Sequence, residues 1–139
     1  MKDFKLSVDE YQNILHNIHL ETIVLSDLNV KRYDEYFGKE FGLDIKSKHR
    51  YATDGDKIVF YSEYKLLAKS QDKEKPAIKI NPEFKIEYSK QSIFVIDPEF
   101  YDIFPNASLH IIVWPYVREL IQNIVTRMGL PPLTLPTIM

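Results

Sequence analysis

The sequence contains no cysteine, and it shows no excess of charge of either sign. Without cysteine, the chain can form no disulfide and no zinc–thiolate site, and it offers no thiol nucleophile. Lysine and arginine number 18 and aspartate and glutamate number 20, which gives a net charge of −2. A domain that binds nucleic acid usually carries a basic surplus, so we expect no nucleic acid partner.

Long apolar segments are missing too. The longest apolar run, residues 109–117, contains His110 and Pro115 and is far shorter than the roughly 20 residues that span a bilayer. Residues 1–6 lack the apolar stretch and the small-residue cleavage site of a signal peptide. We therefore expect a cytoplasmic protein that does not insert stably into a membrane.

Signatures of catalysis and of cofactor binding are also absent. The four glycines form no phosphate-binding loop, and no serine lies in a nucleophile-elbow pattern. His16 and His19 have a spacing that could direct two imidazoles toward a metal, but no third ligand is expected near them. The sequence therefore predicts a protein that is not an enzyme and that holds no metal and no cofactor.

The residues that are present predict one globular domain over residues 1–139. This length is typical of a single domain, and a hydrophobic content of 45% with 13% aromatic residues is enough for a core. Ser7 and Glu10 form a capping-box pattern, which predicts that a short helix begins there. The stripe that this helix would bury consists of Val8, Tyr11, Ile14, Leu15 and Ile18.

Four strands are expected after this helix. Asp54 and Gly55 predict a hairpin turn, because Asp-Gly tolerates the positive φ angles that such turns need. The last strand alternates apolar and charged residues, which indicates an antiparallel sheet with one solvated face. Pro82 lies within that strand and cannot donate to a ladder, so the strand is expected to be at an edge there or to carry a bulge. The four strands are expected at 20–30, 43–51, 57–69 and 78–88.

A helix is expected last, over about residues 115–128 or from an earlier start, because Pro115 suits either a first turn or a kink. Val117, Leu120, Ile121 and Ile124 fall at helical spacing, and Gly129 suits a left-handed residue at the helix end. Strands followed by one main helix indicate an α+β fold, with the helix packed on one face of the sheet.

Seven aromatic residues fall in two segments that we expect to be loops. Residues 31–42 contain the first group, and the second group lies beside the acidic residues Asp97, Glu99 and Asp102. These acids indicate either a solvated loop or a contact for a basic partner. The aromatic rings indicate either a binding groove or rings that fold back into the core. The two groups are Tyr33, Tyr36, Phe37 and Phe41, and Phe100, Tyr101 and Phe104.

The C-terminal part of the sequence resembles a known family. Trp114 to Glu119 form an aromatic-Pro-Tyr-x-Arg-Glu pattern, Gly129 stops the helix, and a tail rich in proline and leucine runs from Pro131 to Pro136. This combination is similar to the SecB family of export chaperones. Upstream of Trp114 the similarity is one of architecture only: a strand, an aromatic crossover loop and three strands joined by hairpins.

The resemblance implies a four-stranded antiparallel sheet and a function. SecB-like proteins hold unfolded or aggregation-prone polypeptide in apolar grooves without ATP. The client would be a preprotein or an antitoxin, and the expected groove residues are Tyr33, Tyr36, Phe37 and Phe41.

The resemblance also implies self-association as a dimer or tetramer. Residues 109–116 are apolar on every side, more than one sheet face can cover, so an interface between subunits is expected to bury the rest. The expected interface residues are Ile112, Trp114, Tyr116, Ile121 and Ile124.

The sequence departs from the export chaperones in two places. The motor SecA is a further possible partner, but the second C-terminal helix that supports this contact in the family has no counterpart before Met139. The helix expected after Ser7 is also unlike the short start of the export chaperones. Both features suit the SecB-like proteins that accompany toxin–antitoxin modules. The alternative is an adaptor or structural oligomer subunit that keeps the fold without the groove.

Overall fold

The structure, a computed structural model, describes residues 5–131 and 133–137. Pro132, part of the predicted proline-rich tail, lies outside the described residues. Four long strands and one long helix make up most of the chain. In chain order the elements are α1 (Val8–Asn17), β1 (Ile18–Arg32), the 3-10 turn η1 (Asp34–Tyr36), β2 (Phe41–Asp54), β3 (Lys57–Ser70), β4 (Ile78–Lys90), α2 (Phe100–Phe104), the π-helical turn η2 (Pro105–Leu109) and α3 (His110–Arg127).

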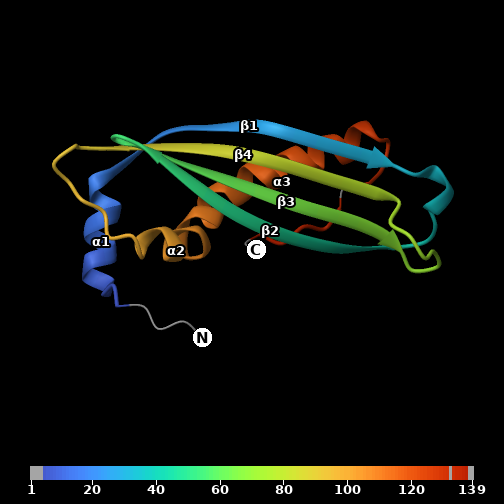
Figure 1. The fold of residues 1–139 in the computed structure, drawn as a ribbon. Coiled ribbons are helices and arrows are strands. Elements are labelled where there is room, and N and C mark those ends of the chain that lie inside the picture. Colours follow the sequence, from blue (N-terminus) through green and yellow to red (C-terminus); the bar gives the residue numbers. More distant parts are fainter. Residues whose placement is uncertain (1–4, 132, 138–139) are drawn as a thin grey trace.

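The four strands form one antiparallel sheet in the order β1-β4-β3-β2. The chain leaves β1 at one edge and crosses to β2 at the other, and β3 and β4 then fill the space between them. Figure 1 shows α3 crossing behind the sheet and α1 at the end where β1 begins. The predicted α+β fold, with one main helix on one face of a four-stranded sheet, is confirmed.

The central strands bury one face and leave the other to solvent. Every second residue of β3 and β4 is buried, which is the alternation expected of a strand with one covered face. The predicted apolar face of β4 packs under the helices, where its side chains are at most 5% exposed. These residues are Ile78, Ile80, Phe84, Ile86 and Tyr88.

Pro82 does not lie on an edge strand, because β4 runs between β1 and β3. Proline has no N–H to donate, and the β3–β4 pairing is interrupted around it, between the Glu63–Glu83 and Leu66–Ile80 pairs. On the other side, β1 shifts register by one residue between Leu25 and Asp27. The irregularity predicted from Pro82 is therefore present, but within an interior strand.

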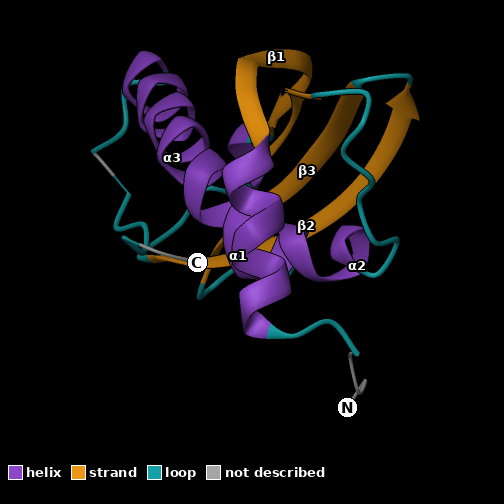
Figure 2. Cartoon of the chain, turned by 90° about the vertical axis from the view of Figure 1, so that its left-hand side faces the viewer, coloured by secondary structure: helices purple, strands orange, loops and turns teal. Residues whose placement is uncertain are grey.

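The capping box at Ser7 is confirmed. The Ser7 hydroxyl accepts a hydrogen bond from the Glu10 N–H at 3.1 Å, and the Glu10 carboxylate accepts one from the Ser7 N–H. Of the predicted stripe, Val8 is wrong, because it is 76% exposed. The rest of the stripe is confirmed: Ile14 and Ile18 are buried, and Tyr11 and Leu15 pack against the core. The Tyr11 ring lies 5.4 Å from that of Phe100 and so joins α1 to α2, which lie beside each other in Figure 2.

Of the two predicted starts of the last helix, the earlier one is correct. The helix starts at His110, and Pro115 lies inside it. Pro115 cannot donate to the carbonyl of Ile111, and this missing hydrogen bond falls beside an exposed residue, since Ile111 is 48% exposed. The predicted stop is confirmed, since Gly129 has a φ of +75°. Within the described residues, no helix combines the length and the apolar character that crossing a membrane requires.

The second aromatic group lies in a helix, and the expectation of a loop was wrong there. Phe100 and Phe104 belong to α2 and are buried, and their rings stack 4.9 Å apart. Tyr101 stacks on Tyr51 of β2, with ring centroids 4.4 Å apart. These rings therefore fill the space between α2 and the sheet, as the core alternative predicted.

The C-terminal segment, residues 133–137, returns alongside α3. Trp114 donates from Nε1 to the carbonyl of Pro136 at 2.8 Å, and Gln122 donates to the carbonyl of Leu133 at 2.6 Å. Leu135 of this segment is buried at 6% exposure. Two hydrogen bonds and one buried side chain thus hold the segment on the helix.

Candidate functional site: an apolar groove beside the crossover

The crossover segment, residues 33–40, carries three of the four aromatic residues predicted to form a groove. Tyr33, Tyr36 and Phe37 are half-buried, and the rings of Tyr33 and Tyr36 meet edge to face at 6.2 Å. Phe41 is the first residue of β2, so its placement in a loop was wrong. Its ring meets that of Phe37 at 5.5 Å, and the two form one contact across the end of the crossover.

Arg32, which the sequence patterns did not single out, fixes the crossover against the helix. Its Nη1 donates to the carbonyl of Met128 at 2.7 Å, and its Nε pairs with Asp34 at 2.6 Å. The guanidinium also lies 4.6 Å from the centre of the Phe37 ring. One side chain at the end of β1 therefore joins the end of α3 to both η1 and Phe37.

The end of the crossover is held by the β3–β4 connection. Ser70 donates to the carbonyl of Lys39 at 2.9 Å, and the Lys39 N–H donates to Asp72 at 3.1 Å. Glu40 then turns the chain with a φ of +41°, in the left-handed region. This turn directs the following residue, Phe41, into the start of β2.

An apolar groove of about 560 Å³ lies between the start of β2 and the residues that follow α3. Phe41 and Leu43 line one side, and Leu130 and Leu133 line the other. All four side chains are half-buried. The remaining lining residues are Glu40, Pro131 and Thr134.

The structure brings only one of the four predicted groove residues to this groove. Phe41 lines it, whereas Tyr33, Tyr36 and Phe37 do not. Tyr33 and Tyr36 instead lie near cations, with Lys79 5.7 Å and Lys75 5.9 Å from their ring centres. The sequence did hold a signal for the missing groove residues, the apolar tail after Gly129, but it did not show that this tail faces β2.

The predicted interface residues differ in their exposure. Trp114 and Ile121 are fully buried within the subunit, against the sheet and the C-terminal segment. Ile112 and Ile124 are half-buried, and Tyr116 is 47% exposed. Only these last three present surface that another subunit could cover.

A second apolar surface lies on β1, on the same sheet face as α3. It is formed by Leu20, Leu25, Leu28 and Val30, which are 37% to 45% exposed. Their partners across the ladder to β4 include Tyr88, Phe84 and Ile80, which are buried. The helix therefore covers the central strands and leaves this strip, which we call the β1 strip, uncovered at the edge of the sheet.

No group of three or more potential metal ligands occurs within residues 5–131 and 133–137. His16 and His19 belong to different elements, α1 and β1. His49 of β2 is the titratable group of interest, since its Nδ1 lies 2.8 Å from the Ser62 hydroxyl. Burial lowers the pKa of His49 below its usual value of 6.5, and the nearby His110 adds to this lowering.

This environment predicts a pH dependence of stability. At pH values between the lowered pKa of His49 in the folded chain and its usual pKa of 6.5 in the unfolded chain, the unfolded chain binds more protons than the folded chain. The free energy of unfolding should therefore fall as the pH drops below about 6.5, through the pKa of the folded state. His49→Gln should flatten this slope in urea unfolding measured from about pH 5 to pH 8, whereas His16→Gln, at an exposed position, should not. An unchanged slope in His49→Gln would contradict the prediction.

The structure is similar to a solved SecB-like chaperone. That protein, from Mycobacterium tuberculosis, is in complex with a ChAD peptide from the HigA1 antitoxin. The TM-score is 0.78 at 16% sequence identity, and the alignment covers 92% of this chain and 95% of that one. The chain therefore has a SecB-like fold.

A protein of unknown function from Streptococcus agalactiae is more distant. It gives a TM-score of 0.49 at 10% identity, covering 86% of this chain and 96% of that one. No family model and no curated protein matches the sequence.

Proposed function

We propose that this protein is a chaperone of the SecB type, which holds unfolded or aggregation-prone polypeptide without ATP. The observation that carries the proposal is the apolar groove between Phe41 and Leu43 on one side and Leu130 and Leu133 on the other. It lies in a chain with a SecB-like fold. A volume of about 560 Å³ is enough to take several apolar side chains of an extended client.

Burial of apolar side chains would supply the affinity. Each client side chain that enters the groove contributes about 1.5–3 kcal/mol before the cost of ordering the client. Several such contacts give useful affinity with fast release, and no nucleotide is needed to reverse them. The Mycobacterium tuberculosis neighbour is in complex with an antitoxin peptide, which favours an antitoxin as the client here. A preprotein client and a contact with SecA stay predictions from the resemblance.

The proposal predicts that the purified protein suppresses aggregation of a chemically unfolded client without any nucleotide. Light scattering of the diluted client, with and without the protein, measures this effect. Added ATP should not change the result, because the mechanism uses burial alone. Equal scattering with and without the protein would instead favour the alternative, an adaptor subunit that keeps the fold.

We also propose that the protein associates with itself through the β1 strip and the exposed side of α3. The β1 strip presents four apolar residues, and Ile111 and Tyr116 of α3 add two more side chains that are about half exposed. Exposed apolar surface of this kind is typical of an interface. Strand β1 also has one free edge, which could pair with a second copy.

Light scattering coupled to size-exclusion chromatography tests this association. The double change Leu25→Asp with Leu28→Asp should shift the wild-type dimer or tetramer to a monomer. Val24→Asp is the matched control, because Val24 is 48% exposed on the same strand but faces the other side of the sheet, opposite Lys85. A wild-type monomer, or equal disruption by the control, would contradict the proposed interface.

A further inference from the structure

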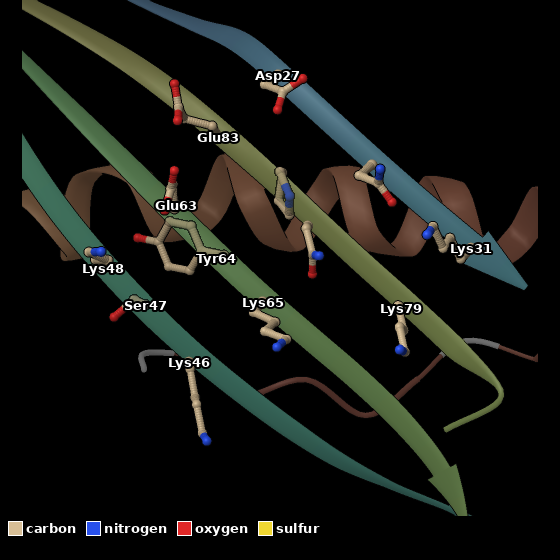
Figure 3. Close-up of a pocket in the computed structure, with 13 residues that line it drawn as sticks. Asp27, Lys31, Lys46, Ser47, Lys48, Glu63, Tyr64, Lys65, Lys79 and Glu83 are labelled. Carbon is tan, nitrogen blue, oxygen red and sulfur yellow. The ribbon is translucent and has the colours of Figure 1, made fainter. Parts of the chain in front are cut away.

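The solvent face of the sheet, opposite the helices, contains a hollow of about 730 Å³. It lies where the β3–β4 pairing is interrupted around Pro82. Pro82 and Tyr64, which belong to the buried face of the sheet, also line it. Figure 3 shows this hollow with α3 behind the strands, so it lies on the face away from the apolar groove. The Asn81 side chain lines it as well, and its Oδ1 is buried without a hydrogen-bond partner in the described chain.

Five lysines line this hollow, and four of them cross it from one edge of the sheet to the other, while the fifth, Lys48 of β2, lies opposite Glu63. Lys46 of β2 lies directly opposite Lys65 of β3, and Lys31 of β1 lies directly opposite Lys79 of β4. We call these four residues the lysine band. Like charges that face each other across a ladder are destabilising, so two such pairs on one surface are unusual.

No carboxylate within residues 5–131 and 133–137 forms a salt bridge with a residue of the lysine band. The acidic residues of the hollow, Asp27, Glu63 and Glu83, form a separate row beside it, as Figure 3 shows. Glu83 is bonded already, since it accepts a hydrogen bond from Ser26 at 3.0 Å and lies 3.4 Å from Arg50. The band is therefore a row of four positive charges without a salt bridge among the described residues, in a chain whose net charge is −2; Lys79 also lies 5.7 Å from the centre of the Tyr33 ring.

We propose that the lysine band binds an acidic, extended segment of a partner polypeptide. Four strands at about 4.8 Å spacing give the band a length of about 14 Å, which matches roughly four or five extended residues. A double-stranded nucleic acid is disfavoured, because its further phosphates would meet the acidic row, which lies about 7 Å from the band along β3 and about 13 Å from it along β4 and β1. The band and the apolar groove lie on opposite faces, so the two sites can be tested separately.

Fluorescence anisotropy with a labelled decapeptide of glutamate tests the proposal. The peptide should bind the wild-type protein at about 50 mM salt and should weaken steeply as the salt concentration rises, since the contact is between exposed charges. A decapeptide of glutamine should not bind. The variant Lys46→Gln with Lys65→Gln should lose at least tenfold in affinity, whereas the control Lys5→Gln with Lys57→Gln, at exposed lysines outside the hollow, should bind like the wild type.

Stability provides a second readout. Because Lys46 and Lys65 repel each other, Lys46→Gln with Lys65→Gln should raise the melting temperature while it weakens peptide binding. The proposal is overturned if the glutamate decapeptide does not bind, or if the band variant and the control bind it equally. It is also overturned if a single-stranded DNA oligonucleotide or anionic vesicles bind the band more tightly than the peptide does.

Discussion

Replacing Trp114 with alanine is expected to lower the free energy of unfolding by about 3–5 kcal/mol, the range for large aromatic residues in a core. Trp114 is 1% exposed, and its ring lies 5.9 Å from that of Tyr64 on the sheet below. The change leaves a cavity between α3 and β3. It also removes the hydrogen bond to the carbonyl of Pro136, so the C-terminal segment loses one of its two bonds to the helix. Urea unfolding followed by circular dichroism measures the change.

One further variant separates the packing contribution from the hydrogen bond, and a second is a control at an exposed position of the same helix. Trp114→Phe keeps most of the ring but loses the Nε1 donor, so it should lose less stability than Trp114→Ala. Tyr116→Ala, two residues along the same helix at a side chain that is 47% exposed, should change the stability by no more than about 0.5 kcal/mol at a protein concentration where the chain is monomeric. Equal losses in Trp114→Ala and Tyr116→Ala would contradict the position of Trp114 in the core.

The elements of the fold could be predicted wherever one physical signal dominated. The alternation in β4, the capping box at Ser7 and the stop at Gly129 each depend on neighbouring residues, and each is confirmed. The start of α3 could not be decided in this way. Proline normally lies in the first turn of a helix, whereas α3 begins at His110 and contains Pro115 in its interior.

The groove could be predicted only in part, because its two sides are distant in the sequence. The aromatic residues before β2 indicated one side, and of these Phe41 lines the groove. The other side comes from Leu130 and Leu133, which reach β2 because Gln122 and Trp114 bind the backbone of the C-terminal segment. These hydrogen bonds span 11 and 22 residues, beyond any local pattern. The same limit applies to Arg32, whose partners Asp34 and Met128 come together only in the folded chain.

Client binding is expected to fall about 100-fold or more when both sides of the groove are changed together. In the double variant Phe41→Ser with Leu133→Ser, each replacement removes an apolar side chain that packs against the client. Each such contact contributes about 1.5–3 kcal/mol to the free energy of binding. A combined loss of about 3 kcal/mol corresponds to roughly a hundredfold change in the dissociation constant. Titration of a labelled unfolded client into each variant measures this constant, and circular dichroism checks that the variant is folded.

Two controls make the result specific to the groove. Ile93→Ser with Val95→Ser removes two apolar side chains that are 87% and 84% exposed outside the groove, and it should bind the client like the wild type. Phe37→Ser tests the crossover aromatics separately, because Phe37 contacts Phe41 but does not line the groove. It should weaken binding less than Phe41→Ser alone. If Phe37→Ser has the larger effect, the client lies on the crossover aromatics, as the sequence predicted, and the groove beside β2 is not the binding site.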